Sequence, residues 1–114
     1  MRWIWVVEAG LPPPLVNHSI CDSWGVLRGE PDLLDLDAGL VGEYDGAHHR
    51  ELARHTSDNV REEDFENLGL EVVRATSIDL WPRRQQLVQR VIAKYERGMA
   101  RDRRKDAWYL RRSA

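Results

Sequence analysis

The hydrophobic positions of this chain change period along its length, and each change predicts an element. An apolar stretch over residues 3–9 predicts a short helix, which Gly10 and the prolines at 12–14 bring to an end. Short aliphatic stretches between turn residues predict strands over 15–21, 25–28, 32–36 and 40–45. Gly39 suits the positive φ of a hairpin turn, so we expect the last two of these strands to pair antiparallel.

The second half of the chain returns to helical spacing. Ser57 or Asp58 is a suitable N-cap for a helix that runs to Leu68 and is closed by Gly69. The stretch 71–76 is rich in β-branched residues and predicts one further strand.

A long helix is expected next, with Pro82 as its first residue. Its core-facing side is predicted by apolar residues at helical spacing: Leu87, Val88, Val91, Ile92, Tyr95 and Met99. Residues 101–112 alternate charged and aromatic side chains, a pattern that fits either a helix or a loose tail.

The central strands are apolar on both faces. Because side chains alternate along a strand, one face is expected to carry Leu34, Leu36 and Val41. The other face is expected to carry Leu33, Leu40 and Tyr44. A sheet that is apolar on both faces must be covered on both faces. We therefore predict an α/β (α+β) fold of three layers, with a mixed sheet of about four strands and the element order αβββαβα.

Composition places the chain among single-domain globular proteins. With 114 residues, 42% of them hydrophobic and 32% charged, residues 1–114 fit one domain and do not resemble a disordered chain. No apolar run approaches the roughly 18–20 residues of a membrane helix, and the first residues lack the features of a signal peptide. The single cysteine, Cys21, cannot form an internal disulfide, so we expect a reducing, cytoplasmic setting.

The net charge of −2 conceals a strong asymmetry along the chain. Residues 1–82 carry 6 basic and 16 acidic side chains, whereas residues 83–114 carry 11 basic and 3 acidic ones. A polyanionic partner would therefore meet mainly the C-terminal part, although attraction between the two ends of the chain explains the asymmetry equally well.

Three acidic residues are expected to meet on the central hairpin. A turn centred at 37–38 pairs Asp32 with Glu43, and directly opposed residues share a face of the sheet. Asp45 lies two residues further along the same strand and points to that face as well. Such carboxylates repel one another unless they bind protons or a hard cation, and Mg²⁺ (or Mn²⁺) prefers oxygen ligands. The alternative is that these residues merely flank turns or face solvent.

These residues carry a resemblance to a nuclease family. Pro31-Asp32 followed by Glu43-x-Asp45 is similar to the PD-(D/E)XK nuclease signature. The longer series resembles the domain-of-unknown-function family 559, which is related to the very-short-patch-repair (Vsr-like) endonucleases. Its elements here are Ala9-Gly10-Leu11-Pro12-x-Pro14-x-x-Asn17, Glu43-x-Asp45-Gly46-x-x-His49, Asp58-x-x-Arg61, Gly69 and Val72-Val73-Arg74-Ala75-Thr76. The likeness covers about Ala9 to Leu87.

The resemblance implies a restriction-endonuclease-like core with a metal site at Asp32 and Glu43, joined by Asp45. It also implies proton transfer or water orientation by His49, and stabilisation of phosphate charge by Arg61 or Arg74. Together these six residues are the catalytic set that the resemblance predicts.

The chain departs from the family pattern in two respects. Asp45 occupies the position where the wider superfamily has lysine, and the only lysines here are Lys94 and Lys105. Relatives also have a longer first helix, with a glutamate that points into the site.

Other candidate chemistry is weaker. Cys21, His48, His49 and His55 match no common zinc spacing, and Cys21 within a strand fits the core better than a nucleophile. We expect Trp3, Trp5, Trp24 and Trp81 to belong to the core or to a homodimer seam.

The basic C-terminal segment 97–114 fits a phosphate-binding surface, with Trp108 and Tyr109 available for base stacking. The residues expected to contact nucleic acid are Arg97, Arg101, Arg103, Arg104 and Lys105. A solvated helix face with salt bridges to Asp102 and Asp106 is the alternative.

The sequence thus predicts a magnesium-dependent endodeoxyribonuclease of the Vsr-like type. Its expected partner is DNA, and no membrane association is expected. The alternatives are a non-catalytic nucleic-acid-binding or interaction module on the same scaffold, and a small partner of a separate DNA-reading protein.

Overall fold

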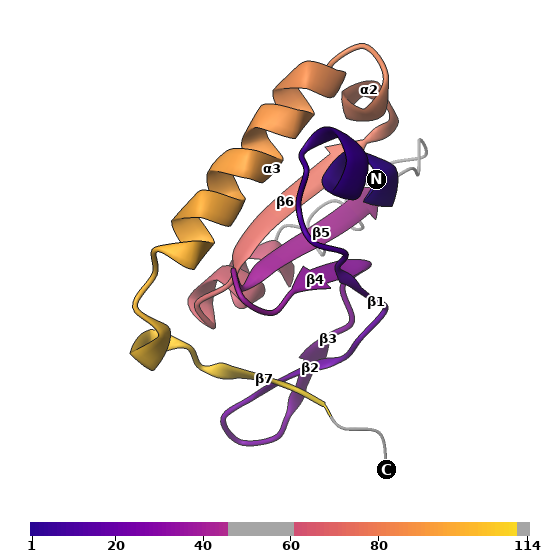
Figure 1. Cartoon of the computed structure of the whole chain (residues 1–114). Helices are drawn as coiled ribbons and strands as arrows, with labels where there is room; N and C mark the ends of the chain where they lie inside the picture. Colours follow the sequence, from indigo (N-terminus) through magenta and orange to yellow (C-terminus); the bar gives the residue numbers. More distant parts are fainter. Residues whose placement is uncertain (46–60, 112–114) are drawn as a thin grey trace.

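The computed structural model describes residues 1–45 and 61–111. In this part of the chain, four strands form a mixed sheet in the order β1-β4-β5-β6 (Figure 1). Their bounds are Leu15–Val16 for β1, Leu33–Asp35 for β4, Leu40–Asp45 for β5 and Glu71–Thr76 for β6. Strands β4 and β5 are antiparallel, as the hairpin turn predicts, and β5 and β6 run parallel.

A second, antiparallel sheet has the order β3-β2-β7. Its strands are β2 (Ile20–Asp22), β3 (Leu27–Gly29) and β7 (Trp108–Leu110). The β2–β3 turn forms as predicted, because the Asp22 carboxylate accepts hydrogen bonds from the backbone N–H groups of Trp24 and Val26, and Gly25 has a φ of +77°. Strands from the first 30 residues therefore form one small sheet with the C-terminal strand β7.

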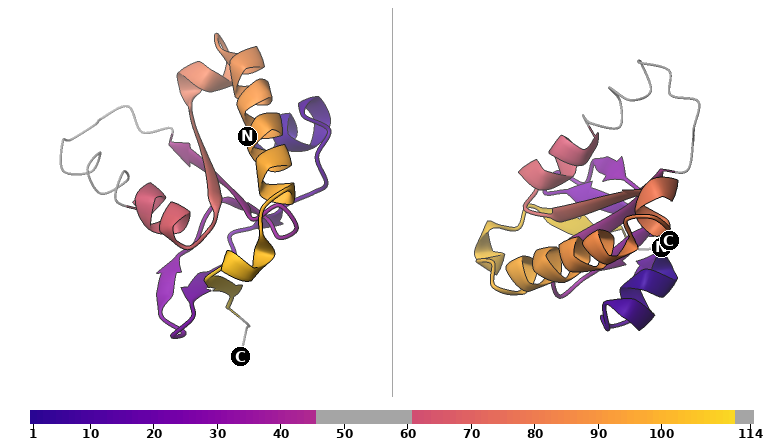
Figure 2. Two further views of the ribbon diagram at one scale, coloured as in Figure 1. Left: turned by 90° about the vertical axis from the view of Figure 1, so that its left-hand side faces the viewer. Right: turned by 90° about the horizontal axis from the view of Figure 1, so that it is seen from above.

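The helical elements are η1 (Ile4–Glu8), α2 (Ser77–Leu80), α3 (Arg84–Met99) and η2 (Arg103–Lys105), and residues 61–67 are also helical. Viewed from above in Figure 2, η1 and α3 lie on one side of the mixed sheet and segment 61–67 on the other. None of the described helices is both long enough and apolar enough to cross a membrane.

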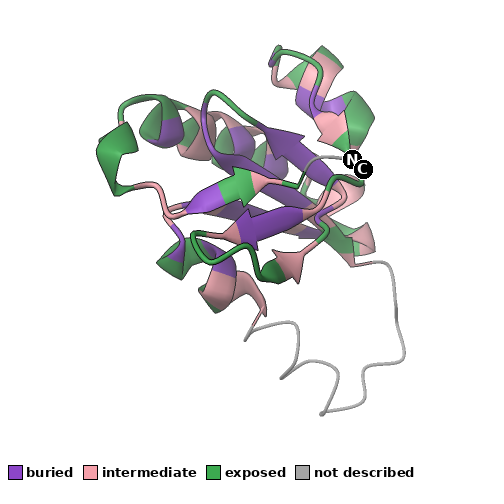
Figure 3. Cartoon of the chain, turned by 90° about the horizontal axis from the view of Figure 1, so that it is seen from below, coloured by how far each residue is buried: buried purple, intermediate pink, exposed green. Residues whose placement is uncertain are grey.

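Each face of the mixed sheet carries its own hydrophobic cluster, as the two-sided pattern predicts. On the η1 and α3 side, Leu33 and Leu40 pack with Trp5, Leu87 and Val91. On the other side the cluster contains Leu34, Val41, Val72, Phe65 from segment 61–67, and Trp108 from β7. Figure 3 shows the buried residues concentrated on the strands between these layers.

Glycines allow the closest approaches around this core. A Cβ at Gly42 of β5 would lie 2.8 Å from the Trp5 ring, and one at Gly98 of α3 would lie 2.9 Å from the carbonyl carbon of Ala38. These positions let η1 and α3 pack directly on the β4–β5 hairpin.

Several expectations about elements are wrong. The strand expected over 15–21 is divided between two sheets, because Asn17 takes a φ of +54° and turns the chain. Pro82 does not begin the long helix: it lies in the turn between α2 and α3, since the capping box of Thr76 and Asp79 begins the short α2 first. Residues 101–112 form neither one helix nor a loose tail over the described part, because β7 pairs with β2.

Some residues expected in the core are exposed. Leu36 lies in the hairpin turn and Tyr44 at the outer end of β5, while Met99 lies in the last turn of α3. Of the four tryptophans expected in the core or a dimer seam, Trp5 is fully buried, and three are exposed: Trp3, Trp24 and Trp81.

Candidate functional site

The hairpin register brings the predicted acidic residues to one face of the mixed sheet. Leu33 pairs with Gly42, so the register continues to place Asp32 opposite Glu43. Asp45 follows two residues later on β5. In the parallel pairing of β5 with β6, Glu43 lies beside Arg74 of β6. These side chains lie on the face that carries Leu34, Val41 and Val72, just beyond the end of that hydrophobic cluster.

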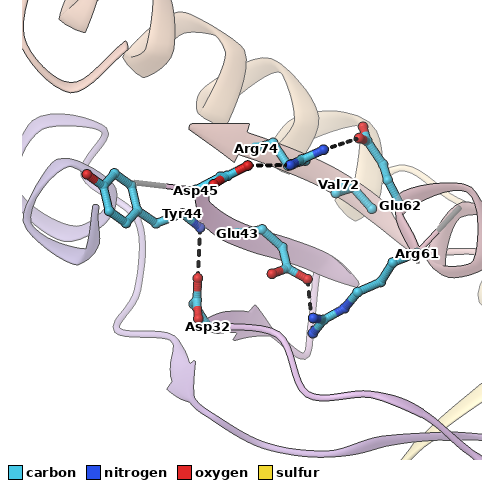
Figure 4. Close-up of a pocket in the computed structure, with 8 residues that line it drawn as sticks. All are labelled: Asp32, Glu43, Tyr44, Asp45, Arg61, Glu62, Val72 and Arg74. Atoms are coloured by element: carbon cyan, nitrogen blue, oxygen red, sulfur yellow. Dashed lines mark hydrogen bonds and ion pairs between the residues drawn. The ribbon is translucent and has the colours of Figure 1, made fainter. Parts of the chain in front are cut away.

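A pocket of about 200 Å³ opens at this place. Figure 4 shows the side chains that line it: Asp32, Glu43, Tyr44, Asp45, Arg61, Glu62, Val72 and Arg74. Four carboxylates and two guanidinium groups therefore share one small, polar hollow, to which β5, β6, segment 61–67 and Asp32, just before β4, contribute.

Each of the three predicted carboxylates has a specific partner. The Asp32 carboxylate accepts a hydrogen bond of 2.7 Å from the backbone N–H of Tyr44, which ties the start of β4 to β5. Glu43 pairs with Arg61, with 3.2 Å between Oε1 and Nη2, and only 17% of its side chain is exposed. Asp45 is more buried still and accepts a hydrogen bond of 2.8 Å from Nη2 of Arg74.

The two arginines are held from further sides. Arg61 also donates to the backbone carbonyl of Glu30 at 2.8 Å, and its guanidinium lies 5.5 Å from the centre of the Phe65 ring. Arg74 reaches Glu62, with 4.0 Å between Nη1 and Oε2. These contacts fix both cations beside the carboxylates, and their charge offsets the repulsion among neighbouring acidic groups.

The oxygen-rich lining suits a hard divalent cation, but the present arrangement is one of ion pairs. Within the described residues, no group of three or more His, Cys, Asp or Glu side chains is arranged to hold a metal ion. Magnesium commonly uses only one or two carboxylates together with water and substrate phosphate oxygens. Asp32 and Glu43, opposite each other on adjacent strands, offer such a pair.

The structure brings five of the six predicted catalytic residues to this pocket: Asp32, Glu43, Asp45, Arg61 and Arg74. The sixth, His49, lies outside the described residues, as do His48 and His55. The sequence did not lead us to expect Glu62 in the site. Its position next to Arg61, in the helix predicted to precede β6, was a usable signal.

The predicted nucleic-acid-binding residues lie elsewhere. Gly69, just before β6, lies against Asp106, which directly follows η2, whereas the pocket is lined by Val72 and Arg74 within β6 and by none of the η2 residues. Arg103, Arg104 and Lys105 are exposed on η2. Arg97 on α3 is exposed as well and pairs with Glu71 at 3.0 Å.

Arg101 and Trp108 do not fit the expected phosphate-binding and stacking surface. Arg101 donates to the backbone carbonyls of Asp37 and Gly98 and to the Asp106 carboxylate, and 13% of its side chain is exposed. Trp108 is buried in the cluster beneath β7, because alternation along this strand leaves only Tyr109 on the outer face. Cys21 is also buried, in agreement with a core position.

Comparisons with protein-family models, curated proteins and solved structures find no match to this chain. The nuclease resemblance therefore stays a prediction, and the function is argued from the pocket.

Proposed function

We propose that the chain is a metal-dependent DNA endonuclease-like protein that hydrolyses phosphodiester bonds at the acidic pocket. The observation that carries the proposal is the convergence of Asp32, Glu43 and Asp45 on one face of adjacent strands, with Arg61 and Arg74 beside them. Carboxylate oxygens suit a divalent cation, and guanidinium groups suit phosphate oxygens.

The arrangement of elements supports a restriction-endonuclease-like core of three layers. An antiparallel hairpin, β4–β5, is followed by the helical segment 61–67 and by β6, which is parallel to β5. Helices η1 and α3 cover the opposite face. The pocket contains Asp32 and Glu43, the residues at which the PD-(D/E)XK resemblance implies a metal site, and this supports the proposal.

In the proposed reaction, Asp32 and Glu43 would hold the metal, and Asp45 would supply a further oxygen ligand or accept a hydrogen bond from a water molecule. The bound cation would polarise the scissile phosphate and lower the pKa of the attacking water. Arg61 and Arg74 would bind non-bridging phosphate oxygens and offset the negative charge that develops on them. A proton-transfer role for His49 remains a prediction from the sequence.

A non-catalytic nucleic-acid-binding module is the second candidate, and one observation favours it. Arg61 and Arg74 already pair with Glu43 and Asp45, so the charge of these two carboxylates is offset without a metal ion. This candidate predicts salt-dependent DNA binding with no heat of metal binding and no cleavage.

The test is nicking of supercoiled DNA with Mg²⁺ or Mn²⁺, together with calorimetric titration of Mn²⁺ alone. Asp32→Asn and Glu43→Gln should each lower the nicking rate at least about 100-fold and weaken Mn²⁺ binding. Glu66→Gln, on the exposed side of segment 61–67, is the matched control and should change neither. Nicking that survives both pocket substitutions would exclude the pocket as its source, and absence of Mn²⁺ binding would favour the non-catalytic module.

A further inference from the structure

A larger hollow of about 420 Å³ adjoins the acidic pocket along the outer edge of β6. The two hollows share Glu62, Val72 and Arg74, so one leads into the other. On its far side the larger hollow is bordered by Arg90 and Lys94 of α3. The same two residues join Arg97 around a third hollow on α3, which continues the path away from the pocket.

The charge along this path is mainly positive. Arg74, Arg90 and Lys94 line the larger hollow, and Glu62 is the acidic side chain that faces them. Residues 90, 94 and 97 are spaced by four and three, so they lie on one face of α3. A row of cations on one helix face suits successive phosphates of a nucleic-acid strand.

The cations differ in how far they are already paired. The side chain of Arg90 is 48% exposed, and its Nη2 lies 3.4 Å from Oδ1 of Asp79. Arg97 forms a salt bridge with Glu71. Lys94 makes no salt bridge with any residue that the structure describes. A lysine ammonium that has no carboxylate partner among the described residues and borders a positively charged hollow is ready to bind an anion.

The same residues argue against an added peptide strand as the occupant. In the described sheet β6 is an edge strand, which is where a peptide strand could pair. However, Nη1 of Arg90 lies 3.5 Å from the carbonyl oxygen of Arg74, in the middle of that edge. Charged side chains over an edge strand oppose strand addition but leave room for a phosphate backbone.

We infer that the groove between the edge of β6 and α3 binds the phosphate backbone of a DNA strand, which it leads from Arg97 past Lys94 and Arg90 to the acidic pocket. The inference rests on the proposed function for the identity of the ligand. It assigns backbone binding to Arg90, Lys94 and Arg97 of α3, two of which border the hollow that adjoins the pocket, and not to η2.

The test is fluorescence anisotropy of a labelled DNA duplex in EDTA, measured over a series of salt concentrations. The double variant Arg90→Gln/Lys94→Gln removes two groove cations, and Arg103→Gln/Arg104→Gln removes two cations of η2. The groove variant should raise the Kd about tenfold and lower the slope of log K against log salt by about two, whereas the η2 variant should leave the slope unchanged.

The single variant Lys94→Gln distinguishes a loss of binding from a loss of folding. Lys94 makes no salt bridge in the described structure, so its replacement should not destabilise the protein. This variant should lower the slope by about one, with an unchanged thermal unfolding curve. Equal effects of the two double variants, an unchanged slope in the groove variant, or no DNA binding by the unmodified protein would each overturn the inference. Since the assay contains no metal and measures no cleavage, the groove can fail while nicking persists, and nicking can fail while the groove binds.

Discussion

At the scale of single residues, Arg61 and Arg74 occupy the place where a cation is expected. Each contacts a carboxylate of the pocket, and each is also held by a second group, the Glu30 carbonyl or the Glu62 carboxylate. A divalent cation entering the pocket would therefore compete with the arginines for the same oxygens. Once displaced, the guanidinium groups would be free to bind phosphate.

This competition gives a prediction with opposite signs for metal binding and cleavage. Arg74→Gln should tighten Mn²⁺ binding about fivefold, since a competing positive charge is removed, yet it should slow nicking. Calorimetry with Mn²⁺ measures the first effect without any reaction. Arg28→Gln is the control of equal charge, because Arg28 pairs with Asp22 and Asp64 outside the pocket. Unchanged or weaker Mn²⁺ binding in Arg74→Gln would contradict the competition.

At the scale of elements, the position of α3 depends on one glycine. A Cβ at Gly98 would overlap the carbonyl oxygen of Ala38 in the β4–β5 turn. That turn sets the register of β4 against β5 and hence the pairing of Asp32 with Glu43. At Gly98, α3 therefore contacts the turn on which this pairing depends.

We predict that Gly98→Ala lowers the free energy of unfolding by about 2 kcal/mol. Alanine gains about 1 kcal/mol of helix propensity, but an overlap with backbone atoms costs more, since neither the helix nor the turn can yield locally. Urea denaturation measures the difference. Gln89→Ala, at an exposed position of the same helix, should change stability by less than about 0.5 kcal/mol. A Gly98→Ala protein as stable as the unmodified chain would show that α3 is free to shift.

At the scale of the whole molecule, the C-terminal segment closes the structure. Strand β7 pairs with β2 and buries Trp108 against the second hydrophobic cluster. Arg101 anchors the segment before it, because its guanidinium joins the β4–β5 turn, the end of α3 and Asp106. A residue that resembles a phosphate ligand in the sequence is therefore a structural one.

Arg101→Gln should lower the free energy of unfolding by about 2–3 kcal/mol, because charge-assisted hydrogen bonds are lost and Asp106 is left without its cation. Chemical denaturation measures the loss. The exposed Arg103→Gln should leave stability unchanged. If instead Arg101→Gln kept full stability but weakened DNA binding, the residue would belong to the nucleic-acid surface after all.

Local pattern alone determined much of the mixed sheet. The stretches 40–45 and 71–76 form the strands that their composition predicts, and the turn at Gly39 fixes the register that places Asp32 opposite Glu43. These features depend on side-chain alternation and turn geometry, which neighbouring residues set among themselves. For that reason the acidic face of the pocket was predictable.

Tertiary structure decided what surrounds that face. Arg61 meets Glu43, and Arg74 meets Asp45, only after the sheet and segment 61–67 have packed together. Strand β7 pairs with β2, although the two strands are far apart in the sequence. Arg101 donates a hydrogen bond to the backbone carbonyl of Asp37, which is also distant in the sequence. Contacts between residues so distant in the sequence leave no periodic signal. They depend on which apolar surfaces are still exposed once the local elements have formed.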